Sequence, residues 1–187
     1  YNTAVGYQAG TAVTTATENT IVGGLAGDAL TTGAANVAVG YNALSASNTA
    51  AGNVAVGANA MLVDTKGARN VAVGYGTLMA QNLTTTSNSY NVAVGFDAGN
   101  DITTGAENTL IGSLAGDALT VGYQNVALGF QALTTGQGSS ANVAIGTAAL
   151  AAANSGATSS TTYNTAVGHL AGTAVTTGIQ NTLIGGI

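Results

Sequence analysis

The sequence predicts an all-β protein, a parallel β-solenoid of about eleven coils with 17 residues each. Two observations predict this fold: a five-residue motif recurs at a nearly constant step, and its apolar positions hold residues typical of strands. The motif also lacks charged residues, which predicts that chains associate side by side. We expect residues 1–187 to form a single repeat segment of a longer chain.

The repeated motif is Asn, then Thr or Val, then Ala, Ile or Leu, then Val, Leu or Ile, then Gly. It occurs eleven times, at steps of 17 residues except for one step of 21 and one of 22. The asparagines, position zero of each coil, are Asn2, Asn19, Asn36, Asn53, Asn70, Asn91, Asn108, Asn125, Asn142, Asn164 and Asn181. The glycines, position four, are Gly6, Gly23, Gly40, Gly57, Gly74, Gly95, Gly112, Gly129, Gly146, Gly168 and Gly185.

Residue type favours strands over helices in this motif. Val, Ile and Thr at positions one to three fit a pleated surface, and a glycine in every copy would cost a helix about 1 kcal/mol each time. We expect two short strands and two turns in each coil. Stacking would align the asparagines as a ladder in the turns before the strands, since Asn side chains bond nearby backbone groups. The glycine suits a backbone that bends or passes close to a neighbour.

Two kinds of coil are distinguished by positions eight and eleven. Where position eight is Gly, position eleven is aliphatic: Val13, Leu30, Ile102, Leu119 and Val175. Where position eight is Leu or Met, position eleven is small or polar: Ser47, Asp64, Gln81, Gly136 and Ala153. We infer that the two kinds fill the outer core from different points of the second strand.

A second exchange of volume links positions two and five. Position two is large only at Ile21, Leu110 and Leu183, and there position five is Gly or Ser. Elsewhere position five is often aromatic: Tyr7, Tyr41, Tyr75, Phe96 and Phe130. Because packed cores conserve volume, this exchange predicts that the aromatic row is buried.

The first strand also predicts association between chains. A strand with one wet face alternates apolar and polar residues, but positions one to three are uncharged in every copy. One face can cover the interior of the coil, and the other needs a second surface. We expect the small alanines at position two to face that surface, in several parallel chains related by cyclic symmetry.

The two longer steps place inserted loops within residues 81–89 and 151–162. Both are rich in small and polar residues, and loops that bulge from a solenoid are where partners bind. Candidate contact residues are Asn82, Thr84, Thr85, Asn88, Asn154, Ser155 and Thr158. The alternative is that both loops are spacers without a ligand.

Composition excludes several classes of protein. The chain has no Cys, which excludes a disulfide scaffold, and its two basic residues cannot form a phosphate-binding surface, so we expect no nucleic acid partner. No apolar run approaches the length of a membrane helix, so we expect no membrane insertion. With 46% hydrophobic and 5% charged residues, disorder is not expected.

Catalytic chemistry is not expected, and neither is a metal or another cofactor. His169 occupies position five, where other coils place Tyr, Phe or Thr, and we interpret it as a packing residue. No second His or Cys is present to form a nucleophilic pair. Glu18 and Asp28 share one coil and could bind a hard cation, but no calcium-binding motif accompanies them. We therefore predict that the protein is not an enzyme.

The segments Asn2 to Gly10 (NTAVGYQAG) and Asn36 to Leu44 (NVAVGYNAL) resemble the head repeats of trimeric autotransporter adhesins. They resemble the repeats of bacteriophage tail-fibre proteins more closely, because the 17-residue step is longer than that of adhesin heads. The resemblance implies a left-handed parallel β-roll in a parallel homotrimer, located outside the cell on a virion tail fibre or a cell-surface appendage. It implies the shaft or head of a fibre that spaces or presents a receptor-binding element. The alternative is the head of a bacterial adhesin, and either could contact a host-surface glycan or protein.

Two further binding functions are compatible with the sequence. Thr14-Thr15, Thr31-Thr32, Thr103-Thr104 and Thr176-Thr177 share positions twelve and thirteen and could form an ice-binding strip. Other residues interrupt that strip, for example Thr65-Lys66 and Asn82-Leu83, which makes it a poor match to a lattice. The aromatic row could stack on sugars instead, but the volume exchange argues that it is buried.

Overall fold

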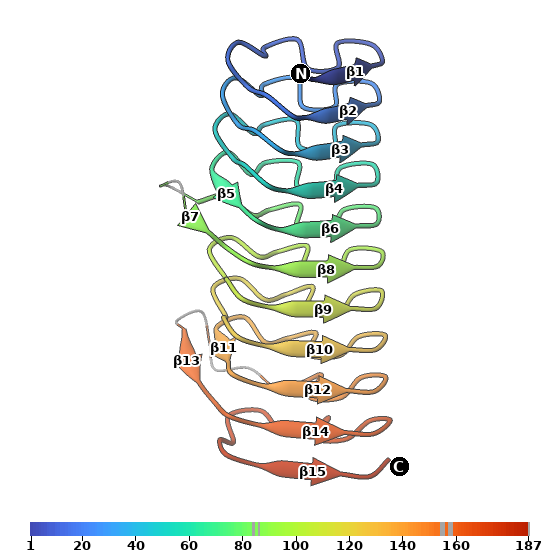
Figure 1. Ribbon diagram of the computed structural model, residues 1–187. Helices are drawn as coiled ribbons and strands as arrows, with labels where there is room; N and C mark the ends of the chain where they lie inside the picture. Colours follow the sequence, from blue (N-terminus) through green and yellow to red (C-terminus); the bar gives the residue numbers. More distant parts are fainter. Residues whose placement is uncertain (84, 86, 154–155, 157–158, 187) are drawn as a thin grey trace.

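The computed structural model describes residues 1–83, 85, 87–153, 156 and 159–186. The described residues contain strands and turns but no helix, and they form a parallel β-solenoid (Figure 1). The predicted fold class is confirmed. One sheet of eleven parallel strands runs the length of the solenoid, and the ten steps between its strands are the coils. The strands are β1 (Thr3–Val5), β2 (Thr20–Val22), β3 (Val37–Val39), β4 (Val54–Val56), β6 (Val71–Val73), β8 (Val92–Val94), β9 (Thr109–Ile111), β10 (Val126–Leu128), β12 (Val143–Ile145), β14 (Thr165–Val167) and β15 (Thr182–Ile184).

Successive strands pair in register, so equivalent residues of neighbouring coils lie side by side. In the centre of the sheet Val54, Ala55 and Val56 of β4 pair with Val71, Ala72 and Val73 of β6. Backbone hydrogen bonds run along the axis, as from Val54 N to Asn70 O (2.9 Å) and from Gly74 N to Val56 O (2.8 Å). The chain has no proline, which would remove a donor from this ladder.

Four short strands lie outside the main sheet. The pair β5 (Gly67–Ala68) and β7 (Ser87–Asn88) and the pair β11 (Ser139–Ser140) and β13 (Ser160–Thr161) are both parallel. Each pair marks one of the two longer steps, and Figure 1 shows both on the same side of the solenoid, beside the start of the main strands. The insertions therefore leave the register of the main sheet unchanged.

Among the described residues, the second strand predicted for each coil forms in only four coils, as the two-residue strands β5, β7, β11 and β13. The rest of each coil consists mainly of turns, and 23 of the described residues other than glycine have a positive φ. All 23 fall at position six, at position eight or directly before the asparagine, as Asn59 (φ 59°), Met61 (φ 52°) and Arg69 (φ 61°) do in one coil. Left-handed residues cost roughly 1–2 kcal/mol each. Backbone bonds to the neighbouring coil hold the conformation, for example Met61 N to Thr77 O (2.9 Å).

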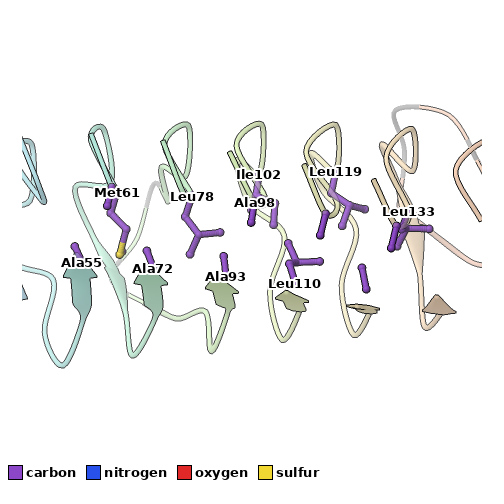
Figure 2. Close-up of a cluster of buried hydrophobic side chains, with 14 of the residues drawn as sticks. Ala55, Met61, Ala72, Leu78, Ala93, Ala98, Ile102, Leu110, Leu119 and Leu133 are labelled. Atoms are coloured by element: carbon purple, nitrogen blue, oxygen red, sulfur yellow. The ribbon is translucent and has the colours of Figure 1, made fainter. Parts of the chain in front are cut away.

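The core lies between the sheet and these turns. Figure 2 shows position-two alanines such as Ala55 and Ala72 facing Met61 and Leu78, which come from the turns opposite. The largest fully buried apolar side chains are Ile21, Leu30, Leu44, Met61, Leu78, Ile102, Leu110, Leu119, Leu133 and Leu150. They come from position eleven in the coils with Gly at position eight and from position eight in the others, with Ile21 and Leu110 at position two. The two predicted kinds of coil are therefore confirmed, although a turn rather than a strand supplies these residues.

The volume of position two is balanced by position eight, not by position five. A Cβ on Gly99 would lie 2.8 Å from Leu110 Cδ1, and one on Gly116 would lie 2.8 Å from Leu110 Cδ2. Ile21 stands in the same relation to Gly10, whose Cβ would lie 3.0 Å from its Cδ1. A large residue at position two thus occupies space left by glycines in its own coil and in the coil before.

Candidate functional site

The asparagines form a continuous ladder along the solenoid. At each of its ten steps the Oδ1 of one asparagine accepts a hydrogen bond from the backbone N–H of the next, at 2.9–3.1 Å. In most coils the side-chain amide also donates to the carbonyl 14 residues ahead, as Asn53 Nδ2 does to Gly67 O (2.8 Å). Each asparagine thereby joins the start of its coil to the end and to the next coil. This geometry gives the residues a structural role.

The position-four glycines occupy a conformation that other residues rarely adopt. Gly57 has a φ of 135°, and a Cβ there would lie 2.3 Å from the carbonyl oxygen of Gly74 in the next coil. The other ten have φ between 126° and 138°. The close axial approach of the coils requires glycine here.

An uncharged and mostly apolar strip faces outward along the whole main sheet, and we call it the outward strip. It consists of positions one and three of each strand: Thr3, Val5, Thr20, Val22, Val37, Val39, Val54, Val56, Val71, Val73, Val92, Val94, Thr109, Ile111, Val126, Leu128, Val143, Ile145, Thr165, Val167, Thr182 and Ile184. These side chains are half-buried or exposed, whereas position two is fully buried in most strands. The prediction that the position-two alanines face a neighbouring chain is therefore wrong, because they line the interior of their own coil.

The aromatic row lies beside this strip, and the prediction that it is buried within the chain is wrong. Tyr7, Tyr41, Tyr75, Phe96 and Phe130 are 48–75% exposed. The rings interact along the axis: those of Tyr75 and Phe96 stack with centroids 5.5 Å apart. His169 continues the row and is also exposed, so it does not pack in the core.

The first insertion is fastened by a network of buried polar groups that the sequence did not reveal. Gln81 Nε2 donates to Ser89 Oγ (2.9 Å) and to Asp64 Oδ2 (3.3 Å), and Gln81 Oε1 accepts from Asn91 Nδ2 (3.2 Å). Asp64 Oδ1 accepts from the backbone N–H of Gly67 (2.7 Å). Asp64, Gln81, Ser89 and Asn91 are all at most 1% exposed. Burial raises the pKa of Asp64 to about 6, against the opposing effect of its backbone donors.

Outside this network, an aromatic contact closes the same insertion. Arg69 Nη1 donates to the Tyr90 hydroxyl (2.9 Å), and the guanidinium carbon lies 5.8 Å from the centre of the Tyr90 ring. Of the predicted contact residues, Asn82, Thr85 and Asn88 are exposed. Thr84 lies outside the described residues.

The second insertion is fastened by hydroxyl groups and contains no buried carboxylate among its described residues. Thr162 Oγ1 donates to Asn142 Oδ1 (2.7 Å) and lies 3.2 Å from Ser140 O. The hydroxyls of Tyr123 and Thr161 lie 3.3 Å apart. The predicted contact residues Asn154, Ser155 and Thr158 lie outside the described residues.

The acidic residues do not assemble a metal centre in the part of the chain that the structure describes, where no group of three His, Asp or Glu side chains could hold an ion. The densest acidic region surrounds Asp117. Burial raises the pKa of its carboxyl, opposed by backbone donors, and the nearby Asp101 and Asp97 raise it further. One carboxylate oxygen of Asp117 is buried without a hydrogen-bond partner.

Most threonines at position twelve bond to the next coil through their hydroxyls. Thr14 Oγ1 donates to Thr31 O (2.9 Å), and Thr103 Oγ1 donates to Thr120 O (3.1 Å).

Among the described residues no helix is long and apolar enough to cross a membrane. Comparison with models of protein families, with curated proteins and with solved structures gave no match for this chain. The fold defines the class, a parallel β-solenoid repeat protein.

Proposed function

We propose that this chain is the shaft or head segment of an extracellular fibre, in which three parallel copies associate along their outward strips. The observation that carries the proposal is the outward strip itself, which is uncharged and runs through all eleven strands of the main sheet. Extended apolar patches on soluble proteins mark surfaces that another molecule covers.

A second copy of the chain fits this strip better than an unrelated partner does. The strip repeats the same residue types at every coil, so an identical chain in parallel offers the same spacing along the axis. Cyclic symmetry would bring the same strip of each copy to a common axis. The aromatic row, directly beside the strip, would then be covered in part by the neighbouring copy. Three is the number implied by the resemblance of the motifs to trimeric fibre repeats.

The mechanism of such a segment is mechanical. Eleven strands at a spacing of about 4.8 Å give a rod of roughly 50 Å. The asparagine ladder and the axial backbone bonds join every coil to the next, so stability accumulates from coil to coil. The rod would hold a receptor-binding element away from the particle, and the insertions, with exposed Asn82, Thr85 and Asn88, would carry contacts to a host-surface glycan or protein.

A bacteriophage tail fibre is the specific setting that we propose, on the length of the repeat. The head of a bacterial surface adhesin would use the same rod and the same strip. Ice binding is less well supported, because several position-twelve hydroxyls are already bonded to the next coil. No catalytic role, cofactor or nucleic acid partner is part of the proposal.

The test places charge on the outward strip. The double variant Val54→Lys/Val56→Lys puts two lysines on one outward-facing strand and should dissociate the assembly, which sedimentation velocity would report as smaller particles. The matched control is Thr15→Lys/Thr32→Lys, at exposed turn positions where Lys66 stands naturally in another coil. If both double variants sediment as the unmodified protein does, the strip is not the interface.

A further inference from the structure

We call the place where Asp64 and Gly67 meet Gln81 and Ser89 the root of the first insertion. It contains a buried carboxyl group that the proposed fibre role does not use. Asp64 is fully buried at position eleven of its coil. The same position in the coil before holds Ser47, and in the coil after it holds Gln81, and both are also fully buried. In these three successive coils a polar column thus occupies position eleven, which holds aliphatic residues in the coils with Gly at position eight and Gly136 or Ala153 in the remaining two.

The hydrogen bonds of Asp64 connect it to both ends of the insertion. Its Oδ1 accepts from the backbone N–H groups of Lys66 (3.2 Å) and Gly67 (2.7 Å), in the segment that leads into β5. Its Oδ2 accepts from Gln81 (3.3 Å), the first residue of the predicted loop. Gln81 in turn donates to Ser89, the last residue of that loop. The side-chain amide of Gln81 therefore joins the two ends of the insertion and contacts the carboxyl group of Asp64.

These donors are neutral, and burial is the main influence on the carboxyl. A buried carboxylate without a matched cation is costly, and the group responds by holding its proton more tightly. The charged side chains closest along the chain are Lys66, which is half-buried, and Arg69, which lies over the Tyr90 ring. Neither of them lowers the pKa of Asp64, which burial raises from 3.8 to about 6.

We propose that Asp64 is a proton-operated clasp for the first insertion, closed when the carboxyl is protonated and loosened when it is ionised. The clasp goes beyond the fibre role and does not depend on it. When the root opens, water reaches Asp64 and the cost of its charge disappears. Ionisation therefore favours the open root, and protonation favours the closed one.

The size of the effect follows from the two pKa values. With a pKa of about 6 in the closed root and 3.8 in water, opening is favoured about a hundredfold more at pH 7.5 than at pH 3. The sign is that of a group whose pKa is raised by burial, so closure is strongest at acid pH. It weakens as the pH rises from 4 to 6.

The second insertion supplies a control within the same molecule. It has the same parallel strand pair at its root, but its fastening groups are hydroxyls: that of Thr162, which donates to Asn142 Oδ1, and that of Ser140, which lies 3.2 Å from Ser159 Oγ. Position eleven in the corresponding coils is Gly136 and Ala153, so no carboxyl occupies that place. Closure of this insertion should not depend on pH in the range where Asp64 titrates.

The experiment is amide hydrogen exchange of the intact protein between pH 4 and 7.5, corrected for the intrinsic dependence of exchange on pH. The reporters are the N–H groups of Gly67 and Ser89 at the first root, the latter bonded to Ala68 O (3.0 Å). The controls are those of Ser160 and Thr162, bonded to Gly138 O (2.9 Å) and Ser140 O (3.0 Å).

Protection of Gly67 and Ser89 should fall by tenfold to a hundredfold across this range, with the controls unchanged. In the variant Asp64→Asn the fall in protection should disappear. If the asparagine side chain does not fit the buried site, Asp64→Ser, which introduces the residue that the preceding coil has at this position, provides the same test. Equal pH dependence at both insertions would overturn the proposal. So would a fall in protection that persists in the variants.

Discussion

Removal of one rung of the asparagine ladder should destabilise the solenoid strongly. In Asn108→Ala, the backbone N–H of Asn125 loses its acceptor, Asn108 Oδ1 (3.0 Å), and the carbonyl of Gly122 loses its donor, Asn108 Nδ2 (2.9 Å). Asn108 and Asn125 are both fully buried, so water cannot readily replace these bonds. A buried polar group without a partner costs about 1–3 kcal/mol, and two such groups give a loss of about 2–6 kcal/mol.

The loss is measured as the change in free energy of unfolding by urea denaturation at fixed protein concentration. The matched control is Thr109→Ala, the next residue, which belongs to the outward strip and should cost less than about 1 kcal/mol. A loss below about 1 kcal/mol for Asn108→Ala would refute the view that the ladder holds the coils together.

Three further predictions concern backbone, core and charge. Gly57→Ala should lower the free energy of unfolding by more than about 2 kcal/mol, because its Cβ would lie 2.3 Å from Gly74 O. Gly52→Ala should cost less than about 1 kcal/mol, since Ala35 and Ala141 already occupy the equivalent position with φ near 58°. Thermal unfolding of the two variants checks this, and equal losses would contradict it. Gly116→Ala should cost about 1–3 kcal/mol of stability by crowding Leu110 and Leu119. When Leu110→Ala is added, the double variant should lose less stability than the sum of the two single variants. A strictly additive result in this double-mutant cycle would refute the shared volume. Because the pKa of Asp64 is raised from 3.8 to about 6, its contribution to stability is greatest below pH 4 and falls by about 3 kcal/mol as the pH rises past 6. Urea denaturation at pH 4 and pH 7.5 should show this fall in the unmodified protein and not in Asp64→Asn. Parallel pH profiles of the two proteins would contradict it.

The solenoid could be predicted from the sequence because the repeat acts on every coil in the same way. A fixed step places Asn36 beside Asn53, and Gly57 beside Gly74, whatever the details of the turns. The exchange between positions eight and eleven could also be read, because a missing leucine at Gly99 requires Ile102 to fill the core. These features follow from volume and spacing alone.

The face of the strand was harder to predict because all three of its residues are apolar. Val54, Ala55 and Val56 do not alternate between apolar and polar, so the pattern does not indicate which side chains point inward. In the structure Ala55, the smallest of the three, faces the interior. The narrow core explains this, since Met61 and Leu78 from the turns occupy most of it and leave room only for alanine opposite. The left-handed turns gave only a weak sequence signal, because Leu, Met and Gln occupy in many coils the same positions that hold glycine or asparagine in others.

The buried network at the first insertion also escaped prediction. It joins Asp64, Gln81 and Ser89, which belong to different coils or to an irregular loop, and only the fold brings them together. Asp64 and Gln81 did stand out as the two largest polar residues at position eleven, which is aliphatic in five coils and holds Ser47, Gly136 or Ala153 in three others. That departure from the repeat was the one available signal.

The absolute mass of the particle in solution tests the central claim most directly. Light scattering on the intact protein should give three chains of 17.9 kDa, about 54 kDa for this segment, if the outward strips meet at a common axis. A stable monomer of 17.9 kDa would contradict the proposed assembly, because the outward strip would then remain in water along its whole length.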